Sequence, residues 1–180
     1  INKPDVSSWL FDNSIKINKI KNTTNDINYS TKKVSYKNIE IVHIKFNNLS
    51  KNNKFIIISN LVSCFGKTLD INSNTYIHYI KNNKDNTIIA IACTNTDENI
   101  EKIYRSQGWK LKDTIGIKAN GIYLYNLFVS KVQQNKGYGK FICNNIIELY
   151  KKRNCNSIHV QIKDNNIIST NLFIKLKFLK

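Results

Sequence analysis

The stretch that most restricts the fold of this 180-residue chain runs from residue 121 to residue 162. GIYLYNLFV, residues 121–129, is rich in aromatic and β-branched residues, as buried strands are. The loop QQNKGYGK, residues 133–140, follows, and apolar residues then recur at helical spacing as far as Tyr150. SIHVQI, residues 157–162, alternates as a second strand does. This order predicts a βαβ unit with two parallel strands, and therefore an α/β fold.

The residues on either side of this unit predict further elements. IEIVHIKF, residues 39–46, alternates as a strand, and the apolar residues of 55–65 recur at helical spacing up to Gly66. TYIHYIK and TIIAIACT, separated by NNKDN, are typical of a hairpin. Residues 95–120 have no clear period, so we expect a long excursion there. A last amphipathic helix is predicted from Ile167 to Leu176.

The first 37 residues differ in composition from the rest of the chain. They are rich in Asn, Lys, Ser and Thr, and their only apolar patch is Trp9, Leu10 and Phe11. We interpret residues 1–37 as a flexible or loosely docked extension and residues 38–180 as the folded domain.

The charge of the chain points to anionic partners. Lys and Arg number 28 against 12 Asp and Glu, a formal net charge of +16. A phosphorylated coenzyme, a nucleic acid or the ribosome would suit this excess, although no basic helix or aromatic RNA-binding motif supports the last two. An AT-rich coding sequence would also enrich Lys, Asn and Ile. The charge therefore gives a direction and not a function, while 41% hydrophobic residues argue against a disordered chain.

The cysteines and apolar runs bear on the cell compartment. The four cysteines form no C-x-x-C pair and have no His at zinc-ligand spacing, so neither a metal site nor a disulfide framework is indicated. No apolar run approaches the roughly 18 residues of a membrane span, and no signal-peptide core is present. We expect reduced thiols in an intracellular, cytoplasmic protein.

The glycine loop is the strongest candidate for a binding site. A strand that enters a helix through such a loop exposes backbone N–H groups at the positive end of the helix dipole, which favours an anion. Gly137 and Gly139 allow close approach, and Lys136 and Lys140 add positive charge. The spacing fits neither the nucleotide P-loop nor the dinucleotide motif, and a lone G-x-G is also typical of an ordinary turn.

The wider pattern resembles the GNAT acetyltransferase superfamily. A hydrophobic strand ending in Leu127-Phe128-Val129, followed by QNKGYG at the position of [QR]-x-x-G-x-[GA], is similar to its acetyl-coenzyme A signature. NIISTNLFIKLKF, residues 166–178, looks like the family's N-x-x-A-x-x-L-Y-x-x-x-G-F. The clear resemblance covers about Gly121 to Phe178. It implies a mixed central sheet with flanking helices, and acetyl-CoA as co-substrate without a metal.

The resemblance also implies which residues bind the coenzyme. Pantetheine would run along Leu127, Phe128 and Val129, and a backbone N–H near Val129 would stabilise the thioester oxyanion. The pyrophosphate would lie on the loop formed by Gln134, Asn135, Lys136, Gly137, Tyr138, Gly139 and Lys140. Asn166 matches a position that contacts the coenzyme, although an Asn there can equally cap a helix.

The catalytic positions depart from the commonest pattern of the family. Tyr123 occupies the position of the usual Glu, and Phe173 replaces a Tyr that serves as acid. Lys177 stands where the family usually has Gly. Tyr123 and His159, on adjacent parallel strands, are similar to the pair with which protein amino-terminal acetyltransferases deprotonate an α-amine through water, and His159 is the expected base. A core histidine and a packed aromatic are the structural alternatives.

These features predict an acetyl-CoA-dependent N-acetyltransferase, with a protein or peptide amino-terminus as the leading acceptor. A small amine such as glucosamine 6-phosphate is the second acceptor class. A weakened acyl-CoA-binding module is the non-enzymatic alternative, because of Phe173 and Lys177. Members of the family continue past the G-F position with one or two further strands that finish the sheet, whereas this sequence stops at Lys180. Here a truncated sequence, a strand from residues 1–37 or a partner chain would account for their absence.

Overall fold

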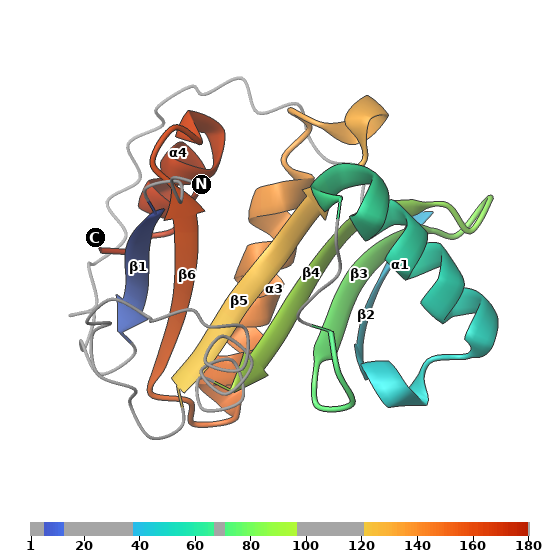
Figure 1. Ribbon diagram of the computed structural model, residues 1–180, viewed down its shortest axis with the longest axis horizontal. Coiled ribbons are helices and arrows are strands. Elements are labelled where there is room, and N and C mark those ends of the chain that lie inside the picture. Colours follow the sequence, from blue (N-terminus) through green and yellow to red (C-terminus); the bar gives the residue numbers. More distant parts are fainter. Residues whose placement is uncertain (1–5, 13–37, 67–70, 97–120, 180) are drawn as a thin grey trace.

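The computed structural model describes residues 6–12, 38–66, 71–96 and 121–179. Six strands of this part form one mixed sheet in the order β1-β6-β5-β4-β3-β2 (Figure 1). Only β5 and β6 are parallel neighbours, and the other pairs are antiparallel. The strands are β1 (Val6–Asp12), β2 (Ile39–Lys45), β3 (Tyr76–Asn82), β4 (Ile88–Thr96), β5 (Gly121–Val129) and β6 (Ser157–Lys163). The predicted α/β fold with a parallel βαβ unit is confirmed.

Three α-helices of the described residues flank the sheet, and Figure 1 shows α1 and α3 on opposite faces. They are α1 (Lys51–Phe65), α3 (Tyr138–Lys152) and α4 (Ile167–Lys175), with short 3₁₀ turns at η2 (Phe46–Asn48) and η3 (Lys131–Gln133). Helix α1 begins before its periodic residues because the Ser50 hydroxyl accepts a hydrogen bond from the Asn53 N–H. It ends where Gly66 takes a left-handed conformation, φ 73°.

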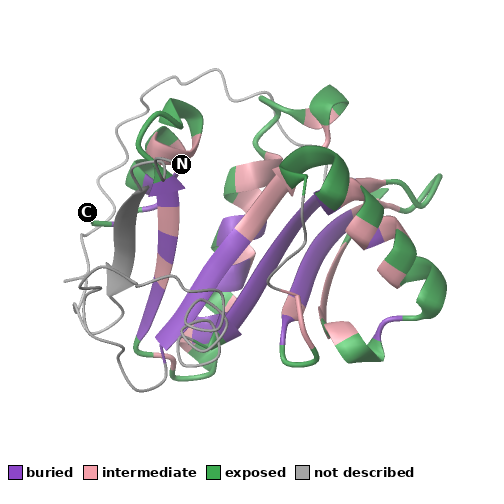
Figure 2. Cartoon of the chain, in the orientation of Figure 1, coloured by how far each residue is buried: buried purple, intermediate pink, exposed green. Residues whose placement is uncertain are grey.

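Strand alternation divides the core between the two faces of the sheet. The α3 face buries Ile122 and Leu124 of β5 with Ile158 and Val160 of β6, beneath α3 and α4. The α1 face buries Tyr123 and Tyr125 together with Ile57 and Leu61 of α1. Figure 2 shows that burial is concentrated along the central strands while α1 is largely exposed. The predicted alternation in β6, with Ile158, Val160 and Ile162 inward, is confirmed.

A strand from the polar extension lies beside β6. Residues 6–12 pair antiparallel with the whole of β6, with Leu10 opposite His159 and Ser8 opposite Gln161. Of the explanations that the sequence left open for the outer side of β6, a strand from residues 1–37 is the one observed. The remainder of that extension lies outside the described residues, as does the excursion from residue 97 to residue 120. Asn95 and Thr96, which we assigned to that excursion, instead end β4.

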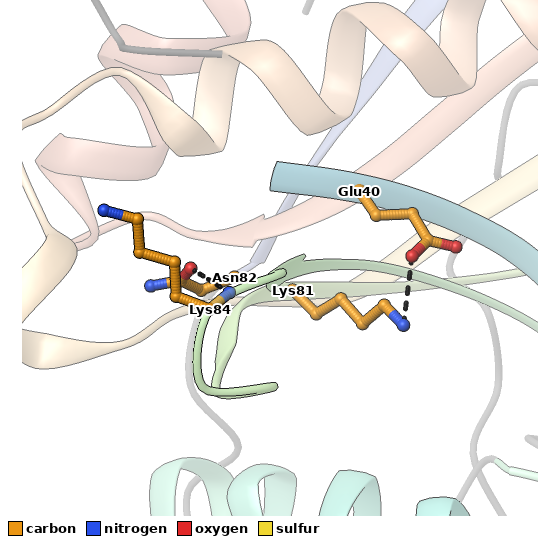
Figure 3. Close-up of polar contacts among 4 residues, drawn as sticks. All are labelled: Glu40, Lys81, Asn82 and Lys84. Carbon is orange, nitrogen blue, oxygen red and sulfur yellow. Dashed lines mark hydrogen bonds and ion pairs between the residues drawn. The ribbon is translucent and has the colours of Figure 1, made fainter. Parts of the chain in front are cut away.

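The predicted hairpin is confirmed as β3 and β4. Its turn is held by short side-chain contacts: the Lys84 N–H donates to Asn82 Oδ1 at 2.9 Å, and Asn86 takes a left-handed conformation, φ 57°. Beside the turn, Lys81 Nζ forms an ion pair with Glu40 Oε2 of β2 at 3.0 Å (Figure 3). This pair links β3 to β2, the strand at the edge of the sheet.

Candidate active site

The parallel strands β5 and β6 separate after three paired positions. Gly121, Ile122 and Tyr123 are opposite Ser157, Ile158 and His159, and no further pair forms although both strands continue. Figure 1 shows the two strands diverging toward the end of β5. The part of β5 beyond residue 123 is therefore not hydrogen-bonded to β6 and faces an opening in the sheet.

The end of β5 directs a backbone donor into this opening. The Ser130 N–H donates to the Ile89 carbonyl at 2.9 Å, and Val129 is opposite Ala90. Backbone groups in an antiparallel pair alternate between facing the partner and facing away, so the N–H and C=O of Val129 face away from β4. The Val129 carbonyl accepts a hydrogen bond from Gln134 Nε2 at 3.2 Å, and the Val129 N–H faces the opening between the two strands.

A β-bulge reshapes β5 at this point. Between Tyr125 and Phe128 the strand spans three residue steps against two in β4, and Asn126 takes a left-handed conformation, φ 51°. The sequence analysis missed this bulge. The available signal was a single Asn within an otherwise aromatic and β-branched strand, because Asn tolerates this conformation better than its neighbours.

The loop after β5 presents backbone N–H groups at the start of α3. Asn135 and Gly137 have positive φ, 60° and 87°, and no side chain caps α3. Alternating left- and right-handed residues point successive N–H groups into a shared concavity, which attracts anions. Tyr138, Gly139 and Lys140 begin the helix there. The loop of residues 134–140 thus directs several backbone N–H groups to the start of α3, and its contact with a pyrophosphate stays a prediction.

Glycine occupies positions 137 and 139 of the loop for two different structural reasons. Gly137 needs its left-handed backbone, which a side chain would strain. A Cβ at Gly139 would lie 3.6 Å from Leu172 Cδ2 of α4 and 3.6 Å from Val129 Cγ2 of β5, which is ordinary van der Waals contact. An alanine therefore fits at 139, and a larger side chain would press against both elements.

Tyr123 and His159 lie side by side on the α1 face. Their ring centroids are 5.2 Å apart, and Tyr123 also stacks on Tyr125 at 5.4 Å. The Tyr123 hydroxyl donates to Gln161 Oε1 at 3.3 Å. Burial lowers the pKa of His159 to about 4, so its imidazole is neutral at physiological pH. A neutral imidazole can accept a proton or a hydrogen bond, but with this pKa it is a weaker base than free imidazole.

A polar group beside this pair was missed from the sequence. Asn95 is opposite Tyr123 in the register, and its Nδ2 lies 3.4 Å from Thr75 Oγ1. Thr75 in turn contacts the Tyr125 hydroxyl at 3.1 Å. These side chains come from three strands or strand ends, so no local spacing could have revealed them. Together these three side chains form an uncharged hydrogen-bonded cluster next to Tyr123 and His159.

The residues singled out in α4 and at its two ends have structural roles. The Asn166 side chain caps α4 by accepting from the Ser169 N–H at 3.1 Å, and a contact with the coenzyme stays a prediction. Phe173 is buried against Phe178, with ring centroids 5.0 Å apart. The backbone of Phe178 donates to the Phe173 carbonyl and that of Lys177 to the Ile174 carbonyl, which is the Schellman ending of a helix. Lys177 takes the left-handed position, φ 65°, that normally favours Gly.

The described residues contain neither a candidate metal centre nor a candidate membrane-spanning helix. No cluster of three or more His, Cys, Asp or Glu side chains suited to a metal ion occurs among them. None of the described helices combines the length and the apolar character needed to cross a membrane.

The fold and the site define a class of α/β proteins that hold an anionic group between two strands. Its marks here are the diverging parallel strands, the N–H at the end of β5 and the glycine loop at the start of α3. The model of the Acetyltransferase (GNAT) family matches residues 59–178, more than half of the chain, and the chain belongs to this family. It is an acetyltransferase that transfers an acetyl group to an amine, and the family uses acetyl-CoA as co-substrate. No curated protein matches the sequence significantly.

Solved structures share the fold at low sequence identity. An aminoglycoside acetyltransferase from an uncultured soil metagenomic sample is 15% identical, with a TM-score of 0.54 over 76% of this chain and 86% of that one. The ribosomal-protein-S18-alanine N-acetyltransferase from Escherichia coli is 11% identical, with a TM-score of 0.53 over 76% of each chain. The IAA acetyltransferase from Bacillus cereus ATCC 14579 is 14% identical, with a TM-score of 0.52 over 77% of this chain and 75% of that one. At such identities these similarities concern the fold alone.

Proposed function

We propose that this acetyltransferase acts on the amino-terminus of a protein or peptide. The observation that carries the proposal is the Tyr123–His159 pair, which lies at the last paired position before β5 and β6 diverge. An amine that reaches the opening from the α1 face meets this pair, while the Val129 N–H lies further along β5. The site thus offers a proton acceptor for the amine and a separate donor for developing negative charge.

Acetyl-CoA supplies the acetyl thioester when it is bound. The loop of residues 134–140 would hold its pyrophosphate, since the N–H groups there form an anion site. The Val129 N–H would donate to the thioester oxygen, where negative charge develops during attack. Leu127 and Phe128 would flank the pantetheine arm along the same strand.

The α-amine suits a neutral, weakly basic imidazole. The pKa of an α-amine is near 8, so about a tenth of the amine is already neutral at pH 7. His159 then needs only to accept a proton, directly or through a water, as the nitrogen attacks. A lysine side chain, with a pKa near 10.4, would present far less neutral amine and would need a stronger base. This difference favours an amino-terminus over an internal lysine.

The test is a measurement of CoA release with acetyl-CoA and a library of peptides that vary in their first residues. Turnover with peptides that carry a free amino-terminus, and none with the same peptides blocked there, supports the proposal. In the His159→Ala variant turnover should fall about 10²- to 10⁴-fold, with the Kd for CoA unchanged within about twofold. Turnover that survives this substitution would remove His159 from the mechanism.

A small phosphorylated amine is the second acceptor class, because the formal charge of +16 would attract it. Glucosamine 6-phosphate should then compete with, or replace, the peptide acceptor in the same assay. Tight CoA binding without turnover on any amine would favour a non-enzymatic acyl-CoA-binding module. Phe173 is the reason to consider this alternative, because a phenyl ring cannot donate a proton to the leaving thiolate.

A further inference from the structure

A cluster of cations and aromatic rings lies where β2 ends and β3 begins. Lys45 Nζ is 5.8 Å from the centroid of the Tyr76 ring, and Arg153 Cζ is 5.3 Å from the same centroid. Lys45 and Tyr76 are opposite each other in the β2–β3 register, and Arg153 follows the last turn of α3. We call Lys45, Tyr76 and Arg153 the Tyr76 patch.

The cations of the Tyr76 patch have no acidic partner in the described part of the chain. Neither Lys45 nor the Arg153 side chain forms an ion pair or a hydrogen bond there. The acid of β2, Glu40, is paired with Lys81 at the other end of the strand (Figure 3). Glu148 of α3 is paired with Lys151 at 3.0 Å. Among the described residues, these two acids therefore do not neutralise the positive charge of the patch.

The same arrangement continues around the edge of the sheet. Lys54 Nζ of α1 is 5.3 Å from the ring centroid of Phe46 and also donates to the Asn47 carbonyl at 3.2 Å. Phe46 directly follows Lys45 in the chain, and its ring packs on the α1 face. Three cations thus alternate with aromatic rings over both faces of this end of the sheet. Such interleaving is how sequence-tolerant sites for single-stranded nucleic acid combine stacking with charge.

The patch is remote from the coenzyme loop. The loop lies at the start of α3 and Arg153 at its end, with the 15 residues of the helix between them. At a rise of about 1.5 Å per residue the two sites are about 22 Å apart. A partner on the Tyr76 patch would therefore not compete with the coenzyme.

We propose that the Tyr76 patch binds a segment of single-stranded RNA. Lys45 and Arg153 would contact successive phosphates. A base would stack on the Tyr76 ring and the neighbouring Arg153 guanidinium group. Anionic lipid would meet the same charges but needs side chains that insert among the acyl chains. The Tyr76 and Phe46 rings are partly buried in the domain and suit a flat base better. This inference is independent of the amine acceptor proposed above.

The test is fluorescence anisotropy with a labelled 12-nucleotide single-stranded RNA over a series of salt concentrations. Single strands contribute about 0.7 to the slope of log K against log salt for each phosphate contact. The variant Lys45→Gln/Arg153→Gln should lower that slope by about 1.4 and weaken binding at low salt about tenfold or more. Tyr76→Leu, which keeps an apolar side chain and removes the ring, should weaken binding about tenfold with the slope unchanged.

The matched control is Lys84→Gln/Lys175→Gln, which removes the same charge from exposed positions elsewhere. It should change affinity less than about twofold, because only general attraction is lost. A control effect as large as that of the patch variant, or an unchanged affinity in Tyr76→Leu, would overturn the proposal. So would binding to vesicles of anionic phospholipid without binding to RNA. If the double variant fails to fold, the single variants Lys45→Gln and Arg153→Gln should each give half the slope change.

Discussion

Nδ1 of His43 lies 2.7 Å from Nδ1 of His78, so one imidazole must donate to the other. The contact is the outer end of a hydrogen-bonded chain through the sheet. His78 Nε2 is 2.7 Å from Thr94 Oγ1, and Thr94 Oγ1 is 2.5 Å from the Tyr150 hydroxyl of α3. Edge strand β2 is thereby connected to α3, the helix that begins at the glycine loop of residues 134–140.

The chain of donors has a preferred direction when both imidazoles are neutral. If Tyr150 donates to Thr94, Thr94 donates to His78 and His78 donates to His43, every hydrogen between them has an acceptor. In the reverse direction the Tyr150 hydroxyl hydrogen has no acceptor within the described residues, which costs free energy in a buried site. We therefore assign the direction from Tyr150 to His43.

This direction predicts unequal effects for two isosteric substitutions. Thr94→Val leaves the buried His78 Nε2 and the Tyr150 hydroxyl unpaired and should lower the free energy of unfolding by about 1–3 kcal/mol. Tyr150→Phe leaves the Thr94-to-His78 bond in place and should cost about 1 kcal/mol. Urea denaturation at pH 7.5 measures both. A larger loss in Tyr150→Phe would argue against the assigned direction.

Three depressed histidine pKa values predict acid sensitivity of the fold. Burial lowers the pKa of His78 well below 6.5 and that of His43 to a lesser degree, with Arg153 adding to both shifts, and burial lowers that of His159 to about 4. The unfolded chain then binds more protons than the folded chain below pH 6.5, so stability is fully present above that pH and is lost as pH falls toward 4.

For His159 alone the loss between pH 6.5 and 4 is roughly 3 kcal/mol. Urea denaturation at half-unit steps from pH 7.5 to 4.5 measures the combined effect. The variant His159→Gln should show a shallower dependence, because it removes one of the three groups. Equal slopes in the two proteins would mean that His159 is not shielded from water in solution.

The same shift predicts the pH dependence of activity. Because His159 stays neutral down to about pH 4, the amine acceptor should govern the profile. The value of kcat/KM with a peptide should rise about tenfold per pH unit from pH 5 to 7 and level off near pH 8, the pKa of an α-amine. A break near pH 6.5 instead would indicate that the coenzyme or acceptor restores an ordinary pKa to His159.

The loop glycines should respond differently to alanine. Gly137→Ala forces a left-handed Ala at the start of α3 and should cost about 1–2 kcal/mol of stability, with weaker CoA binding because the N–H groups turn away. Gly139→Ala adds only ordinary contacts and should keep the Kd for CoA within about threefold. Isothermal titration with CoA, alongside thermal unfolding, compares the two variants. Similar losses in both would contradict the geometry of the loop.

Lys177 offers a stabilising substitution. Its left-handed backbone is unfavourable for a residue with a Cβ, and Gly removes that strain. Lys177→Gly should raise the free energy of unfolding by about 1 kcal/mol, less the greater backbone entropy of Gly in the unfolded chain. Lys175→Gly, inside the last turn of α4, is the opposite control and should destabilise by about 1 kcal/mol. A loss of stability in Lys177→Gly would show that the Lys side chain contributes more than its backbone costs.

Elements with a clear period were predictable from the sequence. The alternation of β6 and the helical spacing of α3 correspond to residues that pack on one face, and both elements form where expected. The loop between β5 and α3 was predicted to be an anion site because backbone N–H groups gather at a helix start, and binding of an anion there stays a prediction. Tyr123 and His159 were placed together by the parallel βαβ unit, and their registers coincide. Their catalytic roles stay predictions.

Other features depend on contacts between distant parts of the chain. The pairing of β1 with β6 joins residues about 150 positions apart, and residues 6–12 were interpreted as part of an extension because most of residues 1–37 are polar. The bulge at Asn126 became visible only against β4. The hydrogen-bonded chain that starts at His43 continues through His78 of β3 and Thr94 of β4 to Tyr150 of α3.

By itself the sequence determined which segments form strands and helices in the βαβ unit, because period, turn residues and helix ends are local properties of the chain. It also placed a glycine loop, residues 134–140, at the start of a helix, where backbone N–H groups favour an anion. The tertiary structure decided what lies across the sheet from each residue: β1 beside His159, Asn95 beside Tyr123, and Arg153 over Tyr76. Strand register and helix docking set those neighbours, and they follow from burial over the whole fold rather than from any local pattern.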